Sequence, residues 1–247
     1  MSVWVLVLSA LMTDYIKLPR LYVDHELTAG HIVTFGEDQA HYLRAVLRQN
    51  PGDRVRVFNG RDGEYICTLD TVGKKAVTGT ATDQLCAQPP APLALHLYFA
   101  PIKKARMDML IEKAVELGAT HLHPVLTQNT EVRNINEDRL RAQIIEASEQ
   151  CERLDVPVLA PAVPLSALAP AAPLYACMER AADAPTLAAA LQPGPAALLI
   201  GPEGGFTATE AETLRQRPDI KCVSLGPRTL RSETAAFAAL ITVQNAR

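Results

Sequence analysis

The segment from residue 196 to residue 206 constrains the fold more than any other part of this sequence. Five apolar residues, Ala-Ala-Leu-Leu-Ile, are followed directly by Gly-Pro-Glu-Gly-Gly-Phe. The apolar run predicts a central strand that is buried on both faces, and the glycines allow a sharp turn that keeps side chains away from a ligand. Thr207 and Glu210 have the spacing of a capping box, so a helix is expected to begin at once and to end before Pro218. The segment therefore predicts a strand–loop–helix unit of a parallel sheet.

The same pattern recurs near the C-terminus. Residues 221–225 predict a strand, Gly226-Pro227 predicts a turn, and residues 232–246 predict a helix. Ligands of parallel sheets bind beyond the carboxyl ends of the strands, so we expect two neighbouring strand ends to form a single cleft. The P-loop motif and the dinucleotide glycine motif are both absent, which disfavours a P-loop nucleoside triphosphatase and a standard dinucleotide fold.

A proline-rich segment at residues 88–92 is expected to be a linker between two domains. Residues 18–88 predict a small, mainly β, barrel-like domain, because short segments alternate polar and apolar residues around one helix. The strands are predicted at residues 54–58, 64–69 and 75–81, and the helix at residues 38–49.

Residues 93–247 alternate predicted strands and helices, which indicates an α/β domain with a parallel sheet covered by helices. Strands are predicted at 93–99 and 120–126 and near Val156, Leu174 and Leu198, with helices at 106–117 and 137–151. The alanine- and proline-rich residues 167–195 are interpreted as packing filler and loops.

Charge and cysteine content exclude several classes of protein. A net charge of −3 argues against coating nucleic acid by bulk electrostatics, so any RNA contact has to come from locally placed cations. The five cysteines form no Cys-x-x-Cys pair, so we expect no metal site and a cytoplasmic location.

The apolar run from Val3 to Met12 is too short to cross a bilayer, and we expect no membrane association. Residues 1–17 are interpreted as an extension: either translation starts at Met12, or this extension is a poorly ordered tail.

Two motifs resemble the signature of the ribosomal RNA small-subunit methyltransferase E family, which belongs to the SPOUT class. They are Gly-Pro-Glu-Gly-Gly-Phe at 201–206 and Leu-Gly-Pro-Arg-Thr-Leu-Arg-Ser-Glu-Thr-Ala at 225–235. Weaker similarity extends over about residues 19–247, including 20–23, 41–48, 51–53, 113–118 and 149–150. The sequence departs from the family at Glu152, where a small residue is expected, and at Ser232, which replaces a threonine.

The resemblance implies a PUA-like barrel followed by a SPOUT-like α/β domain, with helices on both faces of the sheet and a deep trefoil knot. It also implies a homodimer whose active site lies near the subunit interface. The implied activity is methylation of uridine N3 in 16S ribosomal RNA within the small ribosomal subunit, with S-adenosyl-L-methionine as the cofactor. The residues expected to hold this cofactor are Ile200, Gly201, Pro202, Glu203, Gly204, Gly205, Leu225, Gly226 and Leu230.

Uridine N3 carries a weakly acidic proton, so a base or an electrostatic stabiliser has to assist its methylation. Arg231 is our candidate for the electrostatic part, because a guanidinium presents several donors to carbonyl or phosphate oxygens. A salt bridge with Glu233 is the alternative role for Arg231. Glu203 and Glu233 are candidate bases, and each could equally be structural.

Candidate RNA-binding residues lie in both domains. His41, Arg44 and Arg48 are spaced to share one helical face, although a solvated charged face would look the same. Lys103, Lys104 and Arg106 follow the strand at 93–99, and Arg228 lies in the second glycine loop; all four are expected near phosphate. His96, His121 and His123 are interpreted as structural histidines.

Two other functions are compatible with these features. A non-catalytic RNA-binding or ribosome assembly factor would not bind S-adenosylmethionine. A nucleotide-dependent enzyme acting on small metabolites would turn over without RNA.

Overall fold

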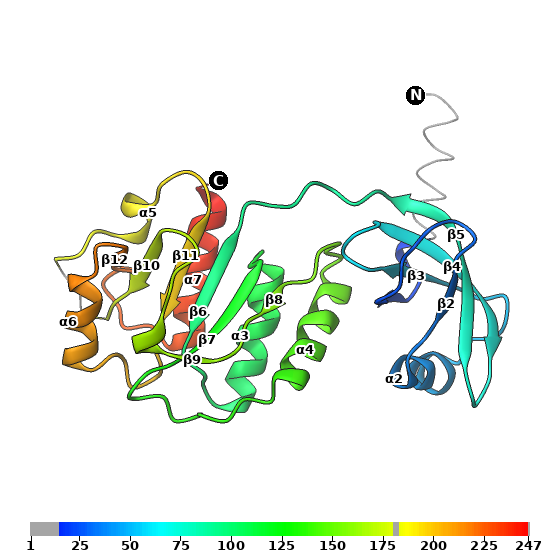
Figure 1. The fold of residues 1–247 in the computed structure, drawn as a ribbon, viewed down its shortest axis with the longest axis horizontal. Coiled ribbons are helices and arrows are strands. Elements are labelled where there is room, and N and C mark those ends of the chain that lie inside the picture. The colour runs from blue at the N-terminus through cyan, green and yellow to red at the C-terminus, as the bar shows by residue number, and fades with distance from the viewer. Residues whose placement is uncertain (1–14, 180–182, 247) are drawn as a thin grey trace. The chain divides into compact units, whose positions relative to one another are not determined.

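The computed structural model describes residues 15–179 and 183–246, which form two compact units (Figure 1). The first unit comprises Met1–Ala91 with Glu152–Val156, and the second comprises Pro92–Cys151 with Pro157–Arg247. The expected translation start at Met12 lies outside the described residues. No helix in the described part of the chain is both long and apolar enough to cross a membrane.

The first unit is built on a five-stranded sheet with the strand order β1-β3-β4-β5-β2. Its strands are β1 (Arg20–Tyr22), β2 (Ile32–Thr34), β3 (Arg54–Phe58), β4 (Glu64–Val72) and β5 (Val77–Cys86). β1 runs parallel to β3, and the other pairs are antiparallel. The alternating residues Val55 and Val57 point into a core that also contains Leu43. The predicted mainly β character of this part is confirmed.

The helix predicted at residues 38–49 is shorter than expected. It consists of α2 (Glu37–His41) and a π-helical turn, η1 (Tyr42–Val46). Arg48 adopts a left-handed backbone with a φ of 54°, and the amide of Gln49 donates to the carbonyl oxygen of Leu43. The expectation that His41, Arg44 and Arg48 share one continuous helical face is therefore wrong, because the chain has left the helix before Arg48.

The second unit contains a seven-stranded parallel sheet with the order β12-β10-β11-β6-β7-β8, and β9 also pairs with β7. The strands are β6 (Leu95–Phe99), β7 (His121–Leu126), β8 (Val158–Leu159), β9 (Val163–Pro164), β10 (Leu174–Cys177), β11 (Ala196–Ile200) and β12 (Ile220–Val223). The helices are α3 (Lys104–Glu116), α4 (Glu137–Gln150), α5 (Leu187–Ala190), α6 (Ala208–Gln216) and α7 (Ser232–Asn245), with a 3₁₀ turn, η2, at Leu165–Ala167.

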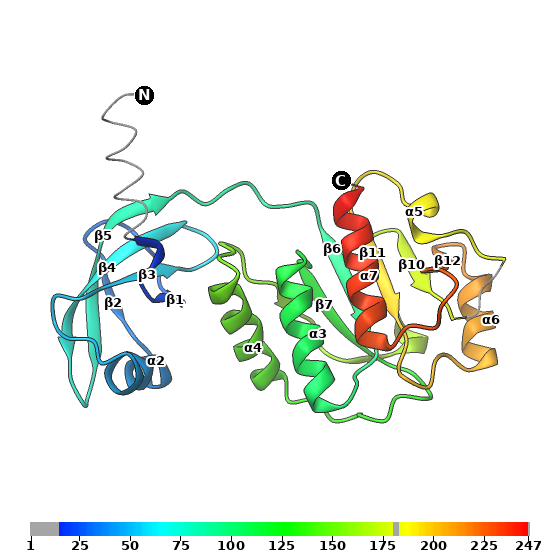
Figure 2. The same ribbon diagram turned by 180° about the vertical axis from the view of Figure 1, so that it is seen from behind.

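Helices cover both faces of this sheet. α3, α4 and α7 lie side by side on one face, which is turned toward the viewer in Figure 2. α6 packs on the other face, where Ala211 and Leu214 join a buried cluster with Leu174 and Leu199 of the sheet. The predicted α/β architecture is confirmed, whereas the trefoil knot stays a prediction, because strand order alone does not define how the chain threads.

The two predicted glycine-loop strands, β11 and β12, are not neighbours, which corrects one expectation. β10 lies between them and pairs with both. This strand confirms the prediction of a strand near Leu174, although the surrounding residues 167–195 were interpreted as packing filler and loops. All four residues of Leu174–Cys177 are nevertheless buried, and a short helix, α5, follows them. The cleft therefore has three strand ends rather than two.

Candidate functional site at the carboxyl ends of three strands

A cleft opens at the carboxyl ends of β10, β11 and β12. Its larger part is a cavity of about 480 Å³, and a second cavity of about 40 Å³ adjoins it. The two share Cys177, Met178, Glu179, Leu230 and Ala235. The larger cavity is also bordered by Ile200–Phe206, and the smaller one by Leu225, Gly226 and Arg228. Both predicted glycine loops thus contribute to one cleft, and the end of β10 joins them.

The first glycine loop disfavours side chains at two of its positions, at one because of the backbone conformation and at the other because of a close neighbour. Gly205 has a φ of 66°, a left-handed conformation that favours glycine. A Cβ on Gly204 would lie 3.2 Å from the Cβ of Asn129. The backbone of this loop consequently lies close to Asn129, and the loop also borders the larger cavity.

Asn129 holds this loop in place from the other side. Its Nδ2 donates to the carbonyl oxygens of Gly204 and Gly205, both at 3.1 Å. One residue earlier, the amide of Gln128 donates to Oε1 of Glu210 at 2.8 Å. These hydrogen bonds were not predicted from the sequence. The only signal for them was the polar pair Gln128 and Asn129, which follows the strand predicted at 120–126.

The predicted capping box starts α6 as expected. The amide of Glu210 donates to Oγ1 of Thr207 at 3.2 Å, and the amide of Thr207 donates to Oε2 of Glu210 at 2.9 Å.

A hydrogen bond connects the second glycine loop to the first, because Oγ of Ser232 donates to the carbonyl oxygen of Gly201 at 2.8 Å. Ser232, where the resemblance leads us to expect a threonine, provides the hydroxyl for this contact.

The three candidate catalytic residues occupy different environments. Arg231 is exposed at the N-cap of α7 and forms no ion pair with a described residue, so the alternative salt bridge to Glu233 is absent. Glu233 is 7% exposed, and its Oε2 has no hydrogen-bond partner in the described structure. Glu203 lines the larger cavity, and its Oε1 lies 3.3 Å from Nη1 of Arg106.

The candidate RNA-binding residues of the second unit are partly engaged with carboxylates. Lys103 lies 3.1 Å from Glu131, and Arg106 contacts Glu203 as described above. Lys104 and Arg228 are exposed and form no ion pair with described residues. Arg228 borders the smaller cavity.

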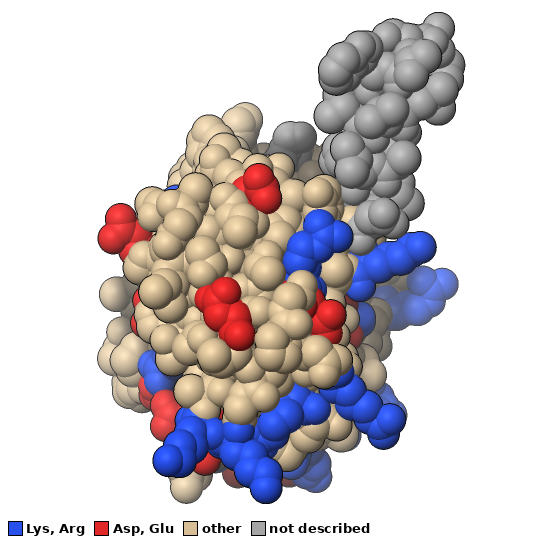
Figure 3. All heavy atoms as spheres, turned by 90° about the vertical axis from the view of Figure 1, so that its right-hand side faces the viewer, with Lys and Arg blue, Asp and Glu red and all other residues tan. Residues whose placement is uncertain are grey.

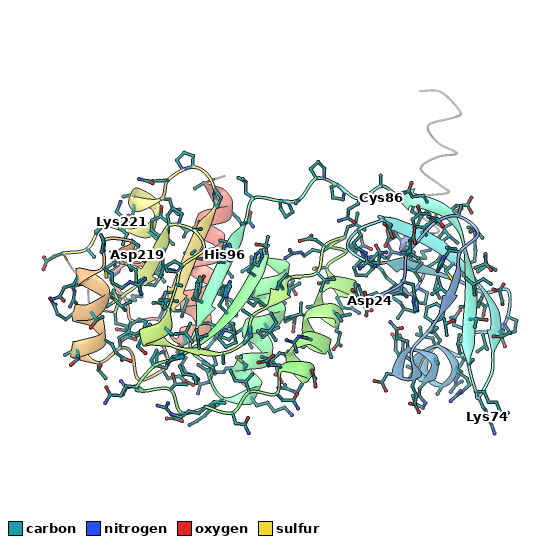
Figure 4. The ribbon with its side chains drawn as sticks, in the orientation of Figure 1. Asp24, Lys74, Cys86, His96, Asp219 and Lys221 are labelled. Atoms are coloured by element: carbon teal, nitrogen blue, oxygen red, sulfur yellow. The ribbon has the colours of Figure 1, made fainter. Side chains whose placement is uncertain are left out.

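In the first unit, basic side chains gather along the lower edge of the face shown in Figure 3. Nη1 of Arg44 donates to the carbonyl oxygen of Gly73 at 3.0 Å, which brings η1 against the tip of the β4–β5 hairpin. Lys74 and Lys75 are exposed at this tip, as Figure 4 shows for Lys74. Arg48 is exposed as well. Sequence reasoning missed the two lysines, because only the folded hairpin brings them beside Arg44.

Four aromatic side chains form a stacked cluster on β6 and β7. Nδ1 of His96 and Nε2 of His123 are 3.0 Å apart, His121 stacks on His96, and Tyr98 stacks on His123. Burial lowers the pKa of all three histidines, that of His123 to about 4, and mutual repulsion contributes at His96 and His123. Within the described residues, no group of three or more histidine, cysteine or acidic side chains is placed to hold a metal ion.

Burial also keeps the cysteine of the cleft unreactive. Cys177 borders both cavities, and desolvation raises the pKa of its thiol to about 12. The thiol form therefore predominates at neutral pH, which disfavours nucleophilic catalysis by this residue.

Comparisons with known proteins agree with this architecture. Residues 89–244 match the model of an RNA methyltransferase domain, and residues 35–81 match that of an RNA methyltransferase PUA domain. The ribosomal RNA small subunit methyltransferase E of Rickettsia conorii is 32% identical, over 92% of this chain and 96% of that protein.

Two solved structures show a similar fold. A methyltransferase of Legionella pneumophila, solved with bound S-adenosylmethionine, has a TM-score of 0.83 at 31% identity and covers 93% of this chain and 98% of its own. The ribosomal RNA small subunit methyltransferase E of Neisseria gonorrhoeae, bound to S-adenosyl methionine, has a TM-score of 0.80 at 28% identity with the same coverage.

Proposed function

The chain belongs to the ribosomal RNA small subunit methyltransferase E family, and from this premise we propose that it methylates N3 of a specific uridine in 16S ribosomal RNA with S-adenosylmethionine. The observation that carries the proposal is the single cleft formed by the loops after β10, β11 and β12, which contains both family motifs. The 16S RNA in the small ribosomal subunit as partner, a homodimeric enzyme and a cytoplasmic location are parts of the same proposal. So are the domain limits, with a PUA-like RNA-binding domain at 18–88 and a methyltransferase domain at 93–247.

The cleft fits the methyl donor in size and in lining. A cavity of about 480 Å³ lies within the range of roughly 300–1,000 Å³ that is usual for small-molecule sites. Backbone groups of Ile200–Gly205, Leu225, Gly226 and Leu230 would hold the adenosine and methionine parts. When bound, the donor supplies an electrophilic methyl group, and the clamped loops keep the site in a fixed geometry for an in-line transfer.

The proton on uridine N3 requires a base, and Glu203 is the better placed of the two candidates. Its carboxylate borders the cavity, and Arg106 holds it in position. Glu233 borders neither cavity and is buried, which favours a structural role at the first turn of α7. We therefore assign the proton transfer to Glu203.

Arg231 is proposed to stabilise the negative charge that develops on the uracil carbonyl oxygens. Its guanidinium is exposed beside the second glycine loop and has no ion-pair partner among the described residues, so its donors remain available to the RNA. A planar guanidinium suits carbonyl and phosphate oxygens equally.

RNA binding is proposed to use locally concentrated cations. In the first unit these are His41, Arg44 and Arg48, now joined by Lys74 and Lys75 at the hairpin tip. In the second unit they are Lys103, Lys104, Arg106 and Arg228. Local patches of this kind position the phosphate backbone although the net charge of the chain is −3.

The proposal is tested by methyl transfer. The protein is incubated with labelled S-adenosylmethionine and small ribosomal subunits that lack the modification, and the nucleosides of the RNA are then separated. We expect label in 3-methyluridine. Label at uridine C5 or at a ribose oxygen would contradict the N3 assignment, and the absence of both donor binding and transfer would indicate a non-catalytic RNA-binding protein.

A further inference from the structure

Three charged side chains border the larger cavity, and only one of them is left uncompensated. Nη1 of Arg215 lies 3.6 Å from Oε2 of Glu212, and Oε1 of Glu203 lies 3.3 Å from Nη1 of Arg106. Glu179 forms no ion pair with any residue that the structure describes. Among the described residues that border this cavity, Glu179 is therefore the charged side chain that lacks a counter-charge.

Glu179 lies where both parts of the cleft meet. It follows β10 and borders the larger and the smaller cavity. Its Oε2 is 3.6 Å from the position that a Cβ would take on Gly205, so the carboxylate lies directly beside the first glycine loop. Arg228 borders only the smaller cavity. An occupant of the larger cavity is consequently exposed to the field of Glu179.

The proposed donor and its product differ by one charge. S-adenosylmethionine carries an ammonium, a carboxylate and a sulfonium, and its net charge is positive. S-adenosylhomocysteine, which remains after the methyl group has left, has lost the sulfonium charge and is neutral overall. The Glu179 side chain is exposed to solvent, but an unpaired carboxylate beside the bound ligand still stabilises the cationic ligand more than the neutral one.

We propose that Glu179 determines which of these ligands the cleft prefers, by favouring the cationic methyl donor over its neutral product. This inference rests on the proposed function and adds a role in donor selection and product release. No residue at this end of β10 was expected in the site, because the sequence around it was interpreted as a loop region.

The test is calorimetric titration of the full-length protein with three probes. These are S-adenosylmethionine, S-adenosylhomocysteine and sinefungin, in which an amine-bearing carbon replaces the sulfonium and keeps a positive charge. In Glu179→Gln, we expect the affinity for the two cationic probes to fall about tenfold, while the affinity for S-adenosylhomocysteine changes less than twofold. Glu179→Asp keeps the charge and should retain the preference of the wild-type protein.

Asp138→Asn is the matched control, because it removes the same charge from a side chain in the first turn of α4 that is 99% exposed and borders no described cavity. It should leave all three affinities unchanged. Equal losses for all three probes in Glu179→Gln, or no loss at all, would overturn the inference while the proposed function stands. If the wild-type protein binds neither cationic probe, the proposed function fails, and the role of Glu179 fails with it.

Discussion

Glu152 and Arg56 form an ion pair in which Nη2 of Arg56 donates to Oε1 of Glu152 at 2.8 Å. Glu152 has a φ of 60°, a conformation that a side-chain-bearing residue adopts only under strain. The resemblance to the family leads us to expect a small residue at this position, and the positive φ is consistent with that expectation. The charged pair thus accompanies a backbone conformation that glycine would adopt without strain.

We predict that Glu152→Gly is more stable than Glu152→Ala by about 1 kcal/mol. Both variants lose the ion pair, but only alanine keeps the strain of the left-handed backbone. The Glu152 side chain is 53% exposed, so the loss of the pair itself is expected to be small. Urea unfolding of the two variants measures the difference, and an alanine variant as stable as the glycine variant would contradict the argument.

Asn129→Ala is expected to weaken binding of S-adenosylmethionine by about fivefold, because two hydrogen bonds to the first glycine loop are lost. Asn129→Asp should weaken it more, since a carboxylate would face the carbonyl oxygens of Gly204 and Gly205. Calorimetry gives both affinities. If the aspartate variant binds the donor as well as the native protein, Asn129 does not hold the loop.

Arg231→Ala should reduce methyl transfer by about 100-fold or more and leave the fold intact. The side chain is exposed and unpaired among the described residues, so its removal breaks no structural contact. Turnover and the melting temperature are measured on the same preparation. A large fall in melting temperature would instead show that Arg231 is structural.

The histidine cluster predicts that stability declines in mild acid. The pKa of His96, His121 and His123 is lowered in the folded protein, that of His123 from 6.5 to about 4. The unfolded chain therefore binds more protons than the folded one between about pH 6.5 and pH 4, so stability is lost as the pH falls through this window. Because the His123 ring is partly exposed and solvent screens part of the effect, we expect His123 to contribute about 2 kcal/mol to this loss of folding free energy.

The variant His123→Phe tests whether His123 is a source of this pH dependence of stability. Phenylalanine preserves the stacking on Tyr98 but cannot bind a proton, so unfolding measured from pH 7 to pH 4 should depend less on pH than in the native chain. An unchanged pH dependence in this variant would exclude His123 as its source.

Local signals in the sequence located the strand–helix units of the second domain correctly. The strand at Ala196–Ile200 and the capping box of Thr207 and Glu210 depend on neighbours in the chain, and both appear in the structure as predicted. The position of β10 between β11 and β12 depends instead on pairing between distant strands, so the sequence did not indicate that Glu179 borders the cleft.

The contacts around the site also depend on residues that are distant from one another in the chain. Asn129 is separated from Gly204 by 75 residues, and no local pattern predicts their hydrogen bond. The π-helical turn at Tyr42–Val46 and the left-handed Arg48 likewise follow from packing of the first unit, which overrides the helical spacing of its basic residues.

A crystal structure of the protein with S-adenosylmethionine tests the central claim most directly. We predict electron density for the donor in the cleft at the ends of β10, β11 and β12, in contact with the backbone of Ile200–Gly205 and of the loop that begins at Leu225. Donor bound elsewhere on the molecule, or an empty cleft at a saturating donor concentration, would contradict it.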